Sequence, residues 1–337
     1  MIEKAIEEIS AGNSLSPEQT SEVIDRFIDG SAKEKEIKAF LTAMHEKGES
    51  VDELVGAAQA LRGRMTRIKT TRPNVVDTCG TGGSGLFTFN VSTASAIVAA
   101  AAGASVAKHG NRRSTSKSGS ADVLAELGVN IECSIETVEK CLNQIGICFC
   151  FAPLFHASVA KVTKVRKKLE FPTIFNLIGP LCNPVDAPFQ LLGAGRGETR
   201  IKMAEALAQL GTKQAMVVHG QDGIGEITVS GVTEVSEIRD GHIAHREIAP
   251  EDFGLSRSKI DLLAVQNPQQ SADIINRVLT GQPGPARDIV IMNAAAALWV
   301  SGISDDLKTG VERCQMAIDK GHANDILGEL KEATNSG

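Results

Sequence analysis

The chain has 337 residues, 42% of them hydrophobic, and a formal net charge of −6 at pH 7. That length can bury the core of one large domain and a smaller one. An acidic chain argues against a general nucleic-acid or anionic-membrane surface, so we expect neither as a partner. The longest apolar run, residues 94–107, is too short to cross a bilayer, and the first residues carry acids where a signal peptide carries lysines. We therefore expect a cytoplasmic protein whose seven cysteines are buried and reduced.

Residues 1–72 are predicted to form helices only. At three places a hydroxyl residue stands three positions before an acid or an amide, which is the spacing of a helix-capping box. Apolar residues recur at helical spacing between these places. The three pairs are Ser16 with Gln19, Ser31 with Glu34, and Ser50 with Glu53.

From residue 74 onward, short apolar strands alternate with amphipathic helices. This alternation predicts an α/β domain with a central, mostly parallel sheet surrounded by helices. The expected strands are residues 74–77, 105–108, 193–196, 215–219 and 226–229. The expected helices are residues 91–101, 121–127, 199–210 and 271–279.

Residues 171–184 interrupt the alternation with three prolines and no clean period. Such a segment suits a crossover between domains better than a core element. We therefore predict a helical domain over residues 1–72, to which a crossover at about 166–184 contributes. The α/β domain is predicted to comprise residues 73–165 and 185–337.

A glycine-rich run, Gly80 to Gly83, follows the first expected strand, and Asn90 to Thr93 opens the next helix. Glycines let backbone N–H groups approach phosphate without interference from Cβ atoms. The hydroxyls after Asn90 either cap the helix or reach a metal ion held by a diphosphate. Taken alone, the run is equally consistent with a plain glycine turn followed by a helix cap.

A second loop, Lys108 to Ser120, places four cations within ten residues and interleaves them with hydroxyls. With Gly110 these groups predict a clamp for phosphate, the alternative being a solvated basic loop. His109 is more typical of a hydrogen-bonded structural histidine than of a catalyst. The two loops together indicate an enzyme that holds a sugar carrying a diphosphate.

Two acids, Asp222 and Glu226, follow the expected strand that ends at His219. A carboxylate at the carboxyl end of a strand is well placed to hold Mg²⁺ on a bound diphosphate. A simple acidic turn explains the two residues equally well, so the sequence leaves both interpretations open.

Several long motifs span nearly the whole chain: DTCGTGG (77–83), NVST (90–93), KHGNR (108–112), KSGSADV (117–123), TIFNLIGPLCNP (173–184), VHG (218–220), APEDFGL (249–255) and NAAAAL (293–298). In order and spacing they resemble the anthranilate phosphoribosyltransferase family. The resemblance implies a helical domain, a larger α/β domain, and a homodimer joined through the helical domain. It also implies a Mg²⁺-dependent transfer of the phosphoribosyl group from 5-phosphoribosyl 1-diphosphate (PRPP) to the amine of anthranilate, an early step of tryptophan synthesis that releases diphosphate.

The resemblance further implies roles for individual residues. Lys108 and Arg166 take catalytic roles, and Ser92 and Glu226 match ligands of Mg²⁺. Anthranilate contacts match Gly80, Asn111, His156 and Arg166. PRPP contacts match Gly80, Thr81, Gly82, Gly83, Ser84, Thr88, Asn90, Val91, Ser92, Thr93, Lys108, His109, Gly110, Asn111, Arg112, Arg113, Ser114, Thr115, Ser116 and Ser120.

Three positions depart from the family's usual pattern. Ser84 and Gly225 stand where the family usually has Asp, and Ala157 stands where it usually has Pro. The loss of two acids should weaken at least one Mg²⁺ site, with Asp222 as a partial replacement.

Two other functions are compatible with the same architecture. A non-biosynthetic relative that binds nucleic acid or another ligand is favoured slightly by the missing acids and opposed by the net negative charge. A pyrimidine nucleoside phosphorylase would need a nucleobase pocket, whereas Asn111 and Arg166 suit a carboxylate.

Overall fold

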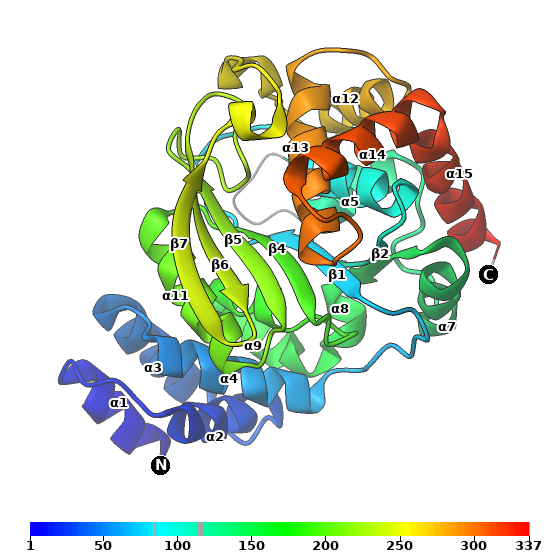
Figure 1. Cartoon of the computed structure of the whole chain (residues 1–337). Helices are drawn as coiled ribbons and strands as arrows, with labels where there is room; N and C mark the ends of the chain where they lie inside the picture. The colour runs from blue at the N-terminus through cyan, green and yellow to red at the C-terminus, as the bar shows by residue number, and fades with distance from the viewer. Residues whose placement is uncertain (84, 113–117, 337) are drawn as a thin grey trace.

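A seven-stranded sheet forms the centre of the computed structural model, which describes residues 1–83, 85–112 and 118–336 (Figure 1). Its strands are β1 (Val75–Gly80), β2 (Ser105–Gly110), β3 (Ile147–Phe151), β4 (Phe189–Gly193), β5 (Gln214–Gly220), β6 (Thr233–Arg239) and β7 (His242–Ile248). They lie in the order β3-β2-β1-β4-β5-β6-β7. The first five strands in that order are parallel, whereas β6 and β7 extend the sheet in antiparallel pairing. The predicted α/β class with a mostly parallel sheet is therefore confirmed.

Helices cover both faces of this sheet (Figure 1). On one face α5 (Val91–Ala101) and α13 (Pro285–Val300) contact the strands, and α12 (Pro268–Leu279), α14 (Leu307–Asp319) and α15 (His322–Asn335) pack against them. On the other face α11 (Gly197–Gln209) packs on β5 and β6. At the β3 edge, α7 (Ile135–Lys140) and α8 (Ala152–Phe155) contact the strand, whereas α6 (Ser120–Glu126) packs on α12 and α5. Among the described residues, none of the helices has the length and apolarity to cross a membrane.

Alternate side chains of the central strands enter two different cores. On β5, Met216 and Val218 belong to the core shared with α5 and α13, whereas Ala215 and Val217 belong to the core shared with α11. All four side chains are buried, as is typical of strands covered on both faces. This double burial fixes the sheet's register and with it the edge where the strands end.

The N-terminal helices form a separate layer against α11. They are α1 (Ile2–Ser10), α2 (Pro17–Ile28), α3 (Glu34–Lys47) and α4 (Val51–Arg64). The segment before β4 packs on the same layer: α9 (Ala160–Arg166) contacts α2 and α3, and α10 (Ile174–Leu177) contacts α3 and α4. Residues 160–184 therefore link the helical layer to the sheet.

The helix caps agree with the sequence at two of three places. Ser16 and Ser50 each cap a helix, accepting a hydrogen bond from the backbone N–H three residues on. The pair Ser31–Glu34 is wrong, because α3 begins after Lys33 and the carboxylate of Glu36 accepts the Lys33 N–H at 2.6 Å. The seven cysteines are buried and form no disulfide, as expected.

Two of the predicted strands are also wrong. Residues 193–196 follow β4, which already ends at Gly193. Residues 226–229 form no strand because side chains satisfy their backbone groups: Asn293 accepts from the Ile227 N–H at 3.0 Å and donates to the Ile227 carbonyl at 2.9 Å. Thr233 Oγ1 accepts from the Thr228 N–H at 3.0 Å. The segment is therefore a loop anchored to α13 and to the start of β6.

Close approach of this loop to β4 requires a glycine at the end of the strand. A Cβ on Gly193 would overlap the carbonyl of Gly225, so we expect Gly193→Ala to lower the free energy of unfolding by about 2–4 kcal/mol. Gly225→Ala is the matched control, because its Cβ would meet Ala194 at an ordinary 3.4 Å. Urea unfolding of both variants measures the difference, and equal losses would contradict this account of the packing.

Candidate active site

The carboxyl ends of the parallel strands meet at one edge of the sheet. Gly80 at the end of β1 pairs with Gly193 at the end of β4, and Gly110 at the end of β2 pairs with Phe151 of β3. Thr81 continues from β1 and is held by β4, since its N–H donates to Gly193 O at 2.9 Å. Ligands of open parallel sheets bind outside this edge, so the predicted loops lie where a site is expected.

The first glycine-rich loop turns sharply after β1. Gly82 and Gly83 have φ angles of 70° and 79°, which glycine adopts at little cost. Thr81 Oγ1 accepts from the N–H of Gly195 at 3.2 Å, which ties the loop to the segment after β4. Thr88 forms an isolated bridge with Ala264 before the chain enters α5. Ser84 lies outside the described residues.

The N-terminus of α5 is built by Asn90, whose side chain accepts from the Thr93 N–H at 3.0 Å. Ser92 Oγ also donates to Asn90 Oδ1, at 3.2 Å. The Asn90 amide donates to the carbonyl of Ser118 at 3.0 Å, so it connects the first loop to the second. Val91 is buried beneath this turn. The predicted cap and the predicted ligand residues therefore occupy the same turn.

Lys108 brings a buried positive charge to this turn. Its side chain is 3% exposed, and its ammonium donates to Thr78 O at 2.5 Å and to Ser92 Oγ at 3.1 Å. Burial lowers the pKa of Lys108, while the carboxylates of Asp77 and Glu226 oppose that shift. The ammonium thus points from β2 toward the start of α5, beside the first loop.

The second loop is anchored at both ends. Gly110 leaves no room for a Cβ beside Ser120 and Phe149, and Ser120 Oγ donates to Asn111 O at 3.3 Å. Arg112 makes ion pairs with Asp122 and Glu132 at 3.5 and 3.2 Å, so in this structure its guanidinium faces α6. The predicted residues Arg113, Ser114, Thr115 and Ser116 lie outside the described part of the chain.

Two neutral histidines lie side by side next to this loop. The rings of His109 and His156 have centroids 5.1 Å apart, and both are held by the crossover segment: His109 Nδ1 by the carbonyl of Gly179 and His156 Nε2 by that of Cys182, each at 3.1 Å. Burial, reinforced by His156, lowers the pKa of His109 to about 3, and burial also lowers the pKa of His156. Neither ring is therefore a strong acid or base at neutral pH.

Arg166, the last residue of α9, faces the crossover segment from the helical layer. Its guanidinium donates to Asn176 Oδ1 at 2.9 Å and lies over the ring of Phe175, 5.5 Å from the centroid. Burial lowers its pKa, although an arginine stays protonated in proteins. One face of a planar cation is thus fixed, which suits a fork-like grip on a carboxylate.

The crossover segment supplies contacts that the sequence did not reveal. Asn176 orients Arg166, the carbonyls of Gly179 and Cys182 orient the two histidines, and Asn183 donates to the Ala107 carbonyl of β2 at 2.8 Å. The motif at 173–184 marked the segment, but it did not show which groups Asn176 and Asn183 contact. The carbonyls of Gly179 and Cys182 carry no signal in side-chain identity.

Glu226 and Asp222 differ in their surroundings. The Asp222 carboxylate accepts hydrogen bonds from the hydroxyls of Thr228 and Ser230, both at 2.5 Å, and therefore holds its own turn together. Glu226 is half-buried and has no hydrogen-bond donor among the described residues. Burial, reinforced by Asp222 and opposed by Lys108, raises its pKa to about 7. Glu226 is therefore the carboxylate available for a ligand.

These residues fit Mg²⁺ only as part of a larger ligand set. The described residues contain no cluster of three or more His, Cys, Asp or Glu arranged to hold a metal ion. Mg²⁺ commonly keeps several waters and takes one or two protein oxygens together with substrate phosphates. The carboxylate of Glu226, which has no hydrogen-bond donor among the described residues, and the Ser92 hydroxyl suit that mode of binding.

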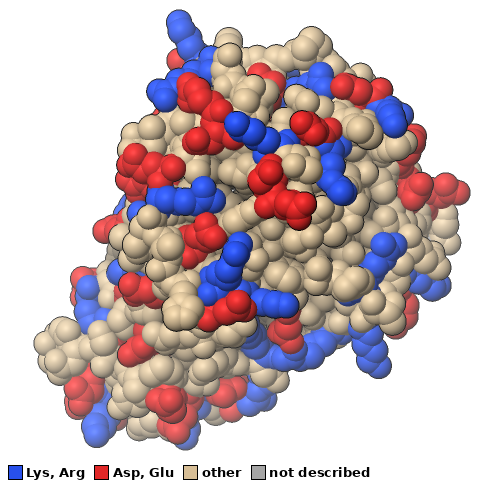
Figure 2. All heavy atoms as spheres, in the orientation of Figure 1, with Lys and Arg blue, Asp and Glu red and all other residues tan. Residues whose placement is uncertain are grey.

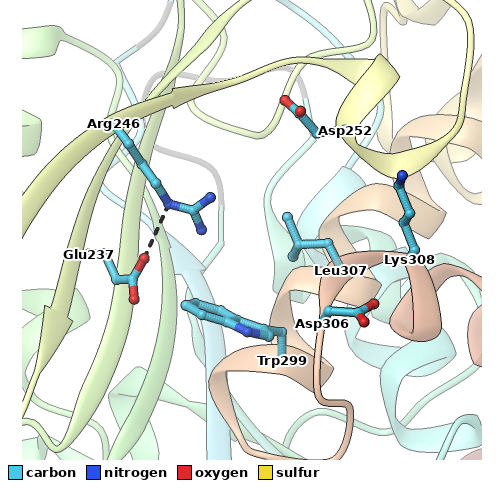
Figure 3. Close-up of a pocket in the computed structure, with 7 residues that line it drawn as sticks. All are labelled: Glu237, Arg246, Asp252, Trp299, Asp306, Leu307 and Lys308. Carbon is cyan, nitrogen blue, oxygen red and sulfur yellow. Dashed lines mark hydrogen bonds and ion pairs between the residues drawn. The ribbon is translucent and has the colours of Figure 1, made fainter.

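A second concave surface lies elsewhere, between β6, β7, α13 and α14 (Figure 3). This groove, of about 520 Å³, includes Glu237, which pairs with Met216 toward the opposite end of β5 from the site. Its groups largely satisfy one another, because Arg246 donates to Glu237 at 3.1 Å and lies over the ring of Trp299. Figure 2 shows Lys and Arg interspersed with Asp and Glu on this side of the molecule. The groove offers no reactive group comparable to those at the strand ends.

Two family models match the chain and divide it as the structure does. Residues 3–65 match the helical bundle domain of a glycosyl transferase family, and residues 72–324 match its a/b domain. Fold and site thus define a glycosyl transferase of the two-domain, helical-bundle class.

Known proteins resemble the chain over its full length. It is 50% identical to an anthranilate phosphoribosyltransferase of Rhodopirellula baltica over 97% of this chain and 96% of the relative, and 43% identical to that of Acetivibrio thermocellus over 100% and 97%. The crystal structure of the Thermus thermophilus enzyme matches with a TM-score of 0.92 at 34% identity, covering 98% of this chain and 99% of that one. A Saccharomyces cerevisiae enzyme in complex with PRPP and Mg matches with a TM-score of 0.90 at 28% identity, covering 100% and 98%. The chain belongs to the anthranilate phosphoribosyltransferase family.

The raised pKa of Glu226 makes a prediction for stability. The folded protein binds a proton here that the unfolded chain loses near pH 4.5, so the stabilisation is complete below that pH and is lost as the pH rises through about 7. We expect Glu226→Gln to be more stable than the parent at pH 8 by about 1 kcal/mol, after allowing for partial solvent access, and nearly equal to it at pH 4. Urea unfolding at both pH values measures this, and a pH-independent difference would contradict the raised pKa.

Proposed function

We propose that this protein transfers the phosphoribosyl group of PRPP to the amine of anthranilate, releasing diphosphate and forming N-(5-phosphoribosyl)anthranilate in tryptophan biosynthesis. The observation that carries the proposal is the buried ammonium of Lys108, directed by β2 to the glycine-rich loop and the start of α5. The full-length similarity to anthranilate phosphoribosyltransferases supports it. That similarity favours this function over the nucleic-acid-binding relative and the nucleoside phosphorylase.

The diphosphate of PRPP binds at the strand edge. Backbone N–H groups of Gly80 to Gly83 and of the turn at Asn90 to Thr93 donate to phosphate oxygens, as helix N-termini and glycine loops commonly do. Lys108 adds a charge-assisted hydrogen bond. We assign the sugar phosphate to the loop after β2, whose described ends are His109 to Arg112 and Ser118 to Ser120.

Departure of diphosphate from C1 leaves an oxocarbenium-like sugar, so the charge on the leaving group is the main obstacle. Mg²⁺ held by Ser92 and Glu226 would supply further neutralisation of that charge when it is bound. Lys108 donates to the departing oxygens in an enclosed site, where a fixed positive charge acts more strongly than in water.

Anthranilate binds on the helical side of the same edge. Arg166 grips its carboxylate, while Gly80, Asn111 and the neutral ring of His156 contact its remaining edges. The aromatic amine is mostly unprotonated at neutral pH and needs orientation more than a base. The low pKa values of the two histidines agree with this lack of a strong base.

We further propose a cytoplasmic homodimer that associates through the helical domain. The first test of the function is the loss of anthranilate fluorescence on addition of PRPP, with Mg²⁺ titrated. Decay that needs both PRPP and Mg²⁺ supports the transferase. Retention on nucleic acid or phosphorolysis of thymidine or uridine, without such decay, would replace it with one of the two alternatives.

Arg166→Ala should raise the KM for anthranilate by about ten- to a hundredfold, because a charged hydrogen bond to the carboxylate contributes about 1.5–3 kcal/mol. The KM for PRPP should change far less. The matched control is Lys164→Ala, which removes an exposed cation two residues earlier on α9. It should change neither KM value. Steady-state kinetics with each substrate varied in turn measures both KM values. Equal effects on the two values would contradict this role for Arg166.

Gly225→Asp should shift the Mg²⁺ titration of activity to lower concentrations, by about tenfold if the new carboxylate reaches the ion. The backbone accommodates it, because a Cβ at this position meets Ala194 at 3.4 Å. Gly225→Asn is the control that adds the same volume without the charge. An unchanged titration in Gly225→Asp would mean that this loop does not hold the metal.

A further inference from the structure

One oxygen atom, Ser92 Oγ, serves both a protein cation and the proposed metal site. Lys108 Nζ donates to it at 3.1 Å and to the carbonyl oxygen of Thr78 at 2.5 Å. Ser92 Oγ in turn donates to Asn90 Oδ1 at 3.2 Å. A cation surrounded by hydroxyl and carbonyl oxygens has the same ligand chemistry as a bound Mg²⁺ ion.

The charges around the ammonium are also those that would attract a metal ion. Glu226 acts on Lys108 from the loop after β5, and Asp77 acts on it from β1. Lys108 is 3% exposed, so its ammonium is confined to this place and does not sample many positions in solvent. The positive charge of the site is thus already supplied before any ligand enters.

Lys108 and a metal ion cannot easily bind Ser92 Oγ at the same time. Mg²⁺ binds oxygen at about 2.1 Å, so an ion on Ser92 Oγ would lie within about 5 Å of the ammonium in its present position. Like charges at that separation repel strongly in a poorly hydrated site. A diphosphate resolves the conflict, because its oxygens can accept from the ammonium and ligate the metal at the same time.

We propose that Lys108 is the resident cation of the metal site in the free enzyme and that it makes Mg²⁺ binding conditional on the diphosphate substrate. The inference rests on the proposed function for the identity of that substrate. When PRPP binds, the ammonium turns from Ser92 to a phosphate oxygen, and the freed hydroxyl becomes available to the metal. Lys108 therefore couples the two ligands, besides touching the leaving group.

The test measures Mn²⁺ binding directly, from the electron paramagnetic resonance signal of the free ion, with and without PRPP and in the absence of anthranilate. We expect the parent protein to bind Mn²⁺ weakly without PRPP and Lys108→Met to bind it at least about tenfold more tightly. PRPP should strengthen Mn²⁺ binding strongly in the parent and much less in the variant. Lys308→Met, which removes the same charge at the distant groove, should behave as the parent (Figure 3).

Unchanged Mn²⁺ affinity in folded Lys108→Met would overturn the inference. If that variant does not fold, a crystal structure of the parent with Mn²⁺ alone decides instead: an ion on Ser92 with Lys108 still bonded there overturns it, and Lys108 on Ser92 with no ion beside it supports it. Turnover of anthranilate tests the proposed function separately. Turnover by the parent together with unaltered metal affinity in the variant removes this inference alone, whereas tighter metal binding by the variant without turnover by the parent removes the proposed function alone.

Discussion

A positive charge placed between the central sheet and α5 is the constraint on which this site depends. Burying an ammonium is costly unless hydrogen-bond acceptors and negative charges surround it. Lys108 is matched by the carbonyl of Thr78, the hydroxyl of Ser92 and the carboxylates of Asp77 and Glu226. These partners come from β1, α5 and the loop after β5, so satisfying one charge fixes the relative positions of the elements that form the site.

On the side of the helical layer, the crossover segment positions the site residues. It runs between the helical layer and β4, and successive residues of it hold Arg166, His109, His156 and β2. Because the same segment belongs to the core of the helical layer, the positions of Arg166 and the two histidines are set by the packing of two domains. A site built this way tolerates little change in how the domains meet.

The sequence predicted the fold class, and it marked the two loops at the strand edge, because both have local signals. Hydrophobic periodicity marks α5 and β5, and glycines with hydroxyls mark the loops at Gly80 and Lys108. It failed at residues 226–229, where a β-like apolar pattern is overridden by a distant partner, Asn293. It also failed to show that Asp222 is occupied by its own turn. Contacts between segments far apart in the chain leave no such local signal.

The loop that carries Glu226 bears on how the proposed metal site could work with few acids. Asn293 and Thr233 hold the loop against β4, and the missing Cβ of Gly193 lets it lie close enough to reach the strand edge. One carboxylate placed there, beside a hydroxyl and an ammonium, would rely on the substrate for the remaining negative charge around a metal ion. In such a site the affinity for the metal is a property of the enzyme–diphosphate complex, and replacing an acid with Gly225 shifts more of that affinity onto the substrate.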